Sequence, residues 1–168
     1  MSKEYFRKNY KGVLIMAVDE KQLDFVSNAL NLVKKKDKRS FRKILKCLKV
    51  IFVPSVRGHL NGTYEKYRVW ITEGGILERN TTPFIASLII HEAHHVSQYL
   101  SGHRYKLPHS EISSLREQMK FLKMINDDFS LNWLEKELQR KWWKDVVGNT
   151  KSTTKLDSYL EILKNLNK

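Results

Sequence analysis

The sequence predicts an α+β fold in which a small three-stranded sheet packs against helical regions at the amino and carboxy termini. Two short apolar runs rich in β-branched residues, 12–18 and 50–53, are typical of buried strands. Residues 64–72 alternate apolar and polar side chains, which indicates a third strand. Longer segments repeat their apolar residues at helical spacing, and 168 residues are enough to bury a core.

The amino-terminal part, residues 1–60, is expected to support the sheet. After the first strand, Asp19 can cap a helix whose apolar residues recur from Leu23 to Val33. A polar break at 34–39 separates this helix from a second, basic amphipathic one. Asn61-Gly62 indicates a turn before the third strand.

Residues 82–102 are expected to form a long helix, with Thr82 as its cap and Pro83 at the first helical position. Inside it the chain reads His91-Glu92-Ala93-His94-His95, the pattern H-E-x-x-H. Because positions i and i+4 share a helix face, the two outer histidines can direct their imidazoles at one metal ion. Glu92 then lies beside the ion, where it can take a proton from a metal-bound water.

A third ligand is needed, because catalytic zinc usually takes three side chains and leaves one position to water. The metzincin continuation is absent, since Gln98 and Ser101 stand where a glycine and a third histidine would be. The next carboxylate is Glu111, in a helix expected to begin after Pro108. Short links favour antiparallel helices, so this glutamate would return close to His95.

Residues 64–122 resemble the small gluzincin-type zinc metallopeptidases, the minigluzincins. That family combines an edge strand, an H-E-x-x-H helix, a short link and a helix with the pattern E-x-x-A-x-x-x-Q. The last element reads Glu111-x-x-Ser114-x-x-x-Gln118 here, with serine in place of alanine. The resemblance covers about a third of the chain.

The resemblance implies one zinc ion per chain, bound by His91, His95 and Glu111. It also implies an endopeptidase-like hydrolysis of peptide bonds with Glu92 as the general base. In this family the third strand is the sheet edge along which a peptide or protein substrate lies. Val69, Trp70 and Ile71 would then contact the substrate by strand addition.

Other polar residues surround the motif without a pattern that fixes their roles. Larger gluzincins carry a downstream histidine or tyrosine that steadies the oxyanion. In this chain His103, Tyr105 and His109 are the candidates for that role or for substrate contact. His109 is also an alternative third ligand, as in a DNA-associated protease of the Spartan type, although the HGxxF-like continuation is missing. We expect His94 to be neutral and exposed.

Charge is the second informative feature, because 31 Lys and Arg residues outnumber 18 Asp and Glu residues for a formal net charge of +13. The basic residues concentrate in Lys34–Lys49, which favours weak, non-specific binding of nucleic acid or acidic protein. Because no nucleic-acid-binding motif accompanies this segment, a solvated basic face without a partner is slightly favoured over a binding surface. A further alternative is a non-catalytic nucleic-acid-binding or regulatory domain with a structural or vestigial zinc site, which an intact Glu92 argues against.

The remaining features concern compartment and domain organisation. Cys47 is the only cysteine, so no disulfide forms within the chain, and the apolar run 13–18 is too short for a signal-peptide core or a membrane span. We therefore expect a cytoplasmic protein. We expect a single zincin-like metallopeptidase domain over 1–168, with 61–125 as the catalytic core and 126–168 as a helical extension carrying helices that begin near Ser130 and Ser152.

Overall fold

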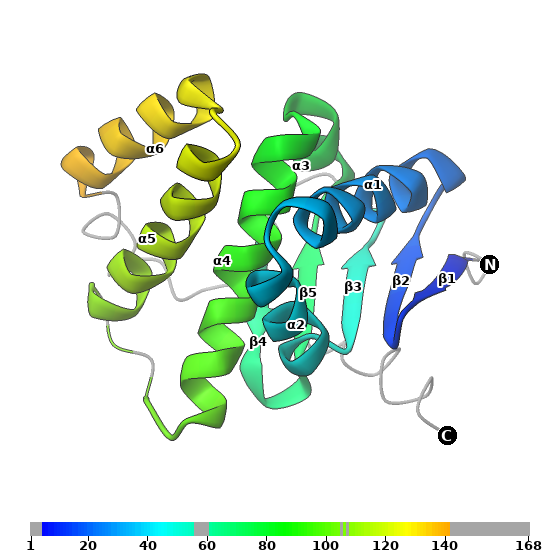
Figure 1. Ribbon diagram of the computed structural model, residues 1–168. Helices are drawn as coiled ribbons and strands as arrows, with labels where there is room; N and C mark the ends of the chain where they lie inside the picture. The colour runs from blue at the N-terminus through cyan, green and yellow to red at the C-terminus, as the bar shows by residue number, and fades with distance from the viewer. Residues whose placement is uncertain (1–4, 56–60, 105, 107, 142–168) are drawn as a thin grey trace.

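The computed structural model describes residues 5–55, 61–104, 106 and 108–141, which form six helices and a five-stranded mixed sheet (Figure 1). The strands are β1 (Phe6–Tyr10), β2 (Val13–Ala17), β3 (Val50–Val53), β4 (Asn61–Tyr64) and β5 (Val69–Thr72). The helices are α1 (Glu20–Lys36), α2 (Lys38–Cys47), α3 (Gly74–Arg79), α4 (Thr82–Leu100), α5 (His109–Met124) and α6 (Asp128–Arg140). The predicted α+β class is confirmed, whereas the prediction of three strands is wrong.

The first additional strand is β1, which pairs antiparallel with β2. A two-residue hairpin turn joins them, in which Lys11 and Gly12 both have positive φ angles, 51° and 91°. The carboxamide of Asn9 accepts a hydrogen bond from the backbone N–H of Gly12 at 2.9 Å and closes the turn. The sequence of β1 does not indicate a strand, because its side chains are largely exposed and do not alternate between buried and exposed positions.

The second difference lies in residues 61–72, which form two strands and not one. A short 3-10 turn, Glu65–Tyr67, and a left-handed Arg68 (φ 59°) reverse the chain between β4 and β5. The strand order is β1-β2-β3-β5-β4, with β5 parallel to β3 and antiparallel to β4. Val69–Thr72 is therefore an internal strand, and the prediction of Val69, Trp70 and Ile71 as edge-strand substrate contacts is wrong. Asn61-Gly62 likewise lies in a strand and not in a turn.

Of the two edge strands in the described sheet, β1 and β4, the second lies next to β5, and its register decides which of its side chains face the helices. Thr63 lies opposite Trp70, whose ring is fully buried in the cluster formed with α1, α2 and α4. Because side chains alternate along a strand, Thr63 also points to this helical side. Val69 and Ile71 point to the other face, into a smaller apolar cluster with Met16 and Phe52.

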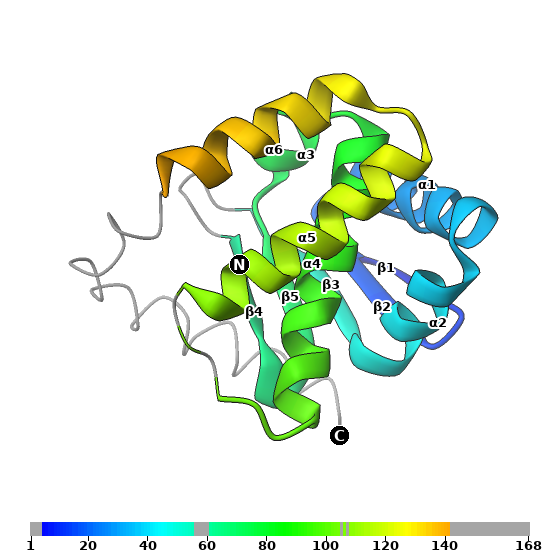
Figure 2. The ribbon, with the colours of Figure 1, turned by 60° about the vertical axis from the view of Figure 1, so that its left-hand side comes forward.

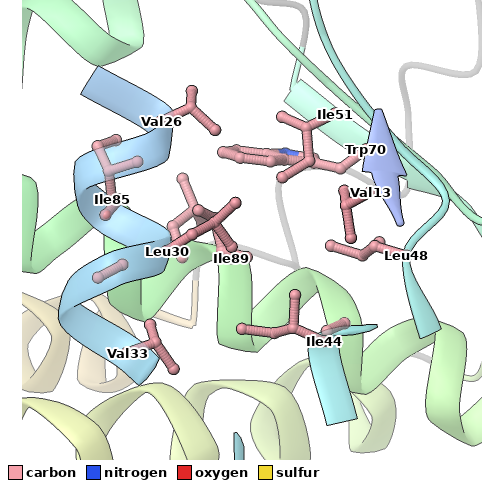
Figure 3. Close-up of a cluster of buried hydrophobic side chains, with 14 of the residues drawn as sticks. Val13, Val26, Leu30, Val33, Ile44, Leu48, Ile51, Trp70, Ile85 and Ile89 are labelled. Atoms are coloured by element: carbon pink, nitrogen blue, oxygen red, sulfur yellow. The ribbon is translucent and has the colours of Figure 1, made fainter. Parts of the chain in front are cut away.

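The main core fills the space between the sheet and helices α1, α2 and α4. Figure 3 shows Val26 and Leu30 of α1, Ile89 of α4 and Ile51 of β3 converging on the ring of Trp70. The helices begin as local rules require, since Asp19 caps α1 by accepting a hydrogen bond from the backbone N–H of Gln22 at 2.8 Å. This confirms the predicted cap.

Asp37 joins α1 to α2 and serves both helices. Its backbone N–H donates to Val33 at the end of α1, while its carboxylate accepts from the N–H groups of Arg39 and Ser40, each at 3.0 Å. The predicted polar break is thus one residue long, because both helices extend into it.

Helices α5 and α6 complete the described chain. α5 runs back antiparallel along α4, and α6 continues from it over the upper edge of the molecule (Figures 1 and 2). Leu115 and Leu122 of α5 pack on Leu131 and Leu134 of α6 in a cluster of their own. The predicted final helix from Ser152 lies outside the described residues. Among the described helices, none is long and apolar enough to cross a membrane.

Candidate metal centre

Helix α4 presents the H-E-x-x-H motif at a buried position. Thr81, one residue before the predicted cap, accepts a hydrogen bond from the backbone N–H of Phe84 at 3.3 Å and starts the helix. His91, Glu92 and His95 are each at most 7% exposed. The apolar residues that precede them anchor the helix in the main core, so the motif is held rigidly against the sheet.

The antiparallel α5 brings Glu111 to the two histidines, as the sequence predicts. Oε1 of Glu111 lies 3.2 Å from Nε2 of His95, and its Oε2 lies 3.4 Å from Nε2 of His91. The two Nε2 atoms are 3.0 Å apart. All three residues are buried, and they are the group within the described residues that could hold a metal ion.

The cluster has the size of a metal site. With zinc–nitrogen and zinc–oxygen bonds near 2.1 Å, neighbouring ligand atoms in a tetrahedral site lie about 3.4 Å apart. The separations of 3.0, 3.2 and 3.4 Å involve both oxygens of Glu111, and a set with one ligand atom from each residue lies within 4.8 Å. Three ligand atoms from one carboxylate and two imidazoles leave a fourth position open, which is the pattern of a catalytic zinc site.

The nitrogen atoms that face away from the triad differ in their partners. Nδ1 of His95 lies 3.3 Å from the hydroxyl of Ser114, which is fully buried on α5. This contact fits an imidazole whose Nδ1–H donates outward while Nε2 is free to bind a cation. Nδ1 of His91 is buried without a hydrogen-bond partner among the described residues. A cation shared by both Nε2 atoms would relieve the crowding of the two rings.

Glu92 lies beside the triad and has its own partner on the edge strand. The hydroxyl of Thr63 donates a hydrogen bond to Oε2 of Glu92. The carboxylate is therefore fixed between α4 and β4 and is not one of the three clustered ligand groups. Sequence reasoning missed Thr63, because the contact depends on the strand register and not on any local motif.

The electrostatics of the triad favour an ionised carboxylate. Burial alone would raise the pKa of Glu111, but hydrogen bonds from the rings of His91 and His95 outweigh it and hold the pKa well below its ordinary range. Burial would lower the pKa of His95, yet the hydrogen bond to Glu111 and the nearby carboxylates of Glu92 and Glu65 raise it overall. The pocket therefore attracts positive charge, as a cation site must.

His94 lies on the flank of α4 that meets α2 and α5 and is only partly exposed, so the prediction of an exposed side chain is wrong. Its Nε2 lies 2.9 Å from the hydroxyl of Ser113, and its Nδ1 lies 3.4 Å from Nζ of Lys43. Burial and then the charge of Lys43 lower the pKa of His94 to about 4, so the ring is neutral near pH 7. This agrees with the predicted neutral state.

The structure does not bring the link residues into the triad. His103 and His109 are exposed, and neither belongs to the cluster of metal-ligating groups formed by described side chains. Tyr105 lies outside the described residues. The geometry therefore does not support His109 as a third ligand. It also does not support His103 or His109 as the residue that stabilises the oxyanion.

A cavity of about 760 Å³ opens over the triad. Its lining includes the three candidate ligands and Glu92, and β4 contributes Asn61, Gly62 and Thr63. The apolar part of the lining comes from four helices; it comprises Ile76, Phe84, Leu88, Leu115, Trp133 and Leu134. The cavity size is in the range of small-molecule and peptide sites.

Comparison with protein families, with curated proteins and with solved structures finds no match to this chain.

Proposed function

We propose that the protein is a zinc-dependent metallopeptidase. The observation that carries the proposal is the buried cluster of His91, His95 and Glu111, whose ligand atoms lie within 4.8 Å of one another, with the carboxylate of Glu92 adjacent to them in the same cavity. A purely structural site has no use for a fixed carboxylate next to its ligands. The open cavity above the triad would admit a substrate.

Zinc in such a site lowers the pKa of a bound water toward about 7 and polarises a substrate carbonyl. The two imidazoles and Glu111 would hold the ion. Glu92 would accept the proton of the attacking water and deliver it to the departing amine as the peptide bond breaks. Thr63, by donating to Oε2 of Glu92, would leave the other carboxylate oxygen to face the water.

The edge strand β4 would orient the substrate. Its described pairing is with β5 alone, and Asn61, Gly62 and Thr63 line the cavity beside Glu92. An extended peptide could add to this edge through main-chain hydrogen bonds. We therefore propose that the substrate contacts β4, and not Val69–Ile71 as the resemblance implied.

A DNA-associated peptidase is the second candidate, and the exposed basic residues of Lys34–Lys49 favour it. In that case the same triad would serve, because His109 is not one of the clustered ligating groups among the described residues. A non-catalytic nucleic-acid-binding domain would retain the basic residues but gain nothing from Glu92. Both alternatives predict nucleic-acid binding, which the peptidase proposal does not require.

The decisive experiment compares wild type, Glu92→Gln and Glu111→Ala, each purified in the presence of zinc. We expect one zinc ion per chain in wild type and in Glu92→Gln, and a large loss of zinc in Glu111→Ala. Cleavage of a mixed peptide library should occur with wild type and fall by about 10²-fold or more in Glu92→Gln. Circular dichroism checks that each variant is folded. Zinc-independent cleavage, or cleavage unchanged in Glu92→Gln, would contradict the proposal.

A further inference from the structure

The wall that α6 gives the cavity combines an aromatic ring with a carboxylate one helical turn away. Trp133 and Glu137 are four residues apart, so they lie on the same face of α6, and both line the cavity. The indole packs edge-on against Phe84, with ring centroids 5.5 Å apart, and 49% of Trp133 remains exposed. The ring is thus held in place while part of its surface is open to a ligand.

A second carboxylate faces the cavity from the side of the sheet. Glu65, in the turn that follows β4, lines the cavity and acts electrostatically on the ring of His95, so its charge lies near the triad. Together with Glu92, Glu111 and Glu137, four carboxylates line the cavity, and the described lining contains no lysine or arginine. A divalent cation would offset two of these four negative charges, which leaves the cavity negative in a protein of net charge +13.

Among the described residues, Glu137 pairs with Arg140, at 3.9 Å on the same helix. Arg140 is 65% exposed in its side chain, and pairs of this kind contribute little in water. A cation that enters the cavity can therefore compete for the Glu137 carboxylate.

We infer that the cavity selects peptides with a lysine or arginine side chain close to the bond that is cleaved. Such a side chain has an aliphatic stem that can lie on the apolar wall and a charged head that needs a carboxylate. Trp133 offers its ring to the stem and the cation, while Glu137 and Glu65 offer their charges to the head. This inference rests on the proposed peptidase function, because it names the substrate class of the same site.

The test measures binding and cleavage separately, so that a failure of selectivity is distinguished from a failure of catalysis. Binding is measured by calorimetry on zinc-loaded Glu92→Gln protein, with peptides that are identical except for one residue: Lys, Arg, Leu or Glu. Cleavage of the same peptides is measured with zinc-loaded wild type. We expect the Lys and Arg peptides to be preferred over the Glu peptide by about tenfold or more.

Variants on α6 identify the source of the preference. Glu137→Gln should weaken binding of the Lys peptide by about fivefold, and Glu137→Lys should shift the preference toward the Glu peptide. Trp133→Ala should weaken binding of the Lys peptide by about tenfold. The matched controls are Glu135→Gln and Phe129→Ala, which change a glutamate and an aromatic residue of the same helix outside the cavity lining and should alter the binding of neither peptide.

Each outcome decides one of the two ideas. Equal binding of Lys and Glu peptides, or a Lys preference that survives Glu137→Lys, would overturn the inference while leaving the peptidase proposal standing. A preference for Leu alone would show that only the apolar wall matters and would also overturn it. Selective binding of Lys peptides without any cleavage by wild type would support the inference and contradict the peptidase proposal.

Discussion

The buried hydroxyl of Ser114 lies 3.3 Å from Nδ1 of His95, on the side of the ring opposite to Glu111. It stands where the resembled family has a small alanine, so this chain adds a polar contact that orients a ligand ring. Groups that hydrogen-bond to the outer nitrogen of a metal-bound histidine fix its tautomer and ring orientation. Helix α5 is therefore connected to the two histidines through two of its residues, Glu111 and Ser114.

Replacing Ser114 by alanine should lower zinc affinity by about tenfold, because Nδ1–H of His95 loses its acceptor. Competition with a zinc chelator gives the affinity directly. Ser113→Ala is the matched control, since the neighbouring serine contacts His94 and not a triad residue. Equal affinities in the two variants would mean that the Ser114 hydroxyl does not orient the ring.

Replacing Thr63 by valine should slow peptide cleavage by about tenfold while zinc affinity stays unchanged, because the variant frees the Glu92 carboxylate without touching a ligand. Thr63→Ser keeps the hydroxyl and should retain most of the rate. The measurement is the cleavage rate at saturating zinc together with chelator competition. A loss of zinc in Thr63→Val, or an unchanged rate, would contradict a role in holding the base.

Replacing Asp37 by alanine should destabilise the fold by about 1 kcal/mol, because two backbone N–H groups at the start of α2 lose their acceptor. Asp37→Asn should lose less stability, since the carboxamide oxygen can still accept hydrogen bonds from these N–H groups. Denaturant unfolding measures the difference. Asp24→Ala is the control, because it removes only an exposed ion pair with Lys8 and should change stability by less than about 0.5 kcal/mol.

The basic surface consists of the exposed members of the 34–49 segment, namely Lys34, Lys35, Lys36, Lys38, Arg39, Arg42, Lys46 and Lys49. None of them forms an ion pair with another described residue, and the carboxylate of Asp37 is engaged as a helix cap. We expect weak binding of duplex DNA that falls steeply with salt, at a slope of about −0.9 per phosphate neutralised.

Reversing the charges of Lys38, Arg39 and Arg42 should abolish this binding in a filter or fluorescence assay at low salt. The control reverses an equal number of exposed charges on α5, at Arg116, Lys120 and Lys123. Binding that survives physiological salt and depends on the basic surface would favour the DNA-associated peptidase over the general one.

The parts of the fold that follow local rules were predictable from the sequence. The helix with the motif shows its apolar spacing and its histidines within one segment, although its cap is Thr81 and not the predicted Thr82. Glu111 follows from a short link between antiparallel helices. β1 was missed because Phe6–Tyr10 has no alternation, and its partner is chosen by hydrogen bonding and not by burial.

The edge strand was misplaced because residues 64–72 alternate as one strand would. The reversal at Arg68 depends on a left-handed backbone angle at a non-glycine residue, which carries little sequence signal. Thr63 and Trp133 reach the cavity only through tertiary packing, so no spacing rule could select them. The candidate ligands can thus be recognised from local sequence patterns, whereas the residues that line the cavity around them cannot.

The small cluster that holds α6 against α5 is separate from the main core around Trp70. Helices that rest on few buried contacts open at a lower free energy than the elements of the central core. The amide hydrogens of α6 should therefore exchange with solvent faster than those of α4, and a bound peptide that touches Trp133 should slow them. The part of the cavity lined by α6 can therefore open by local unfolding, while α4, which carries His91 and His95, stays folded.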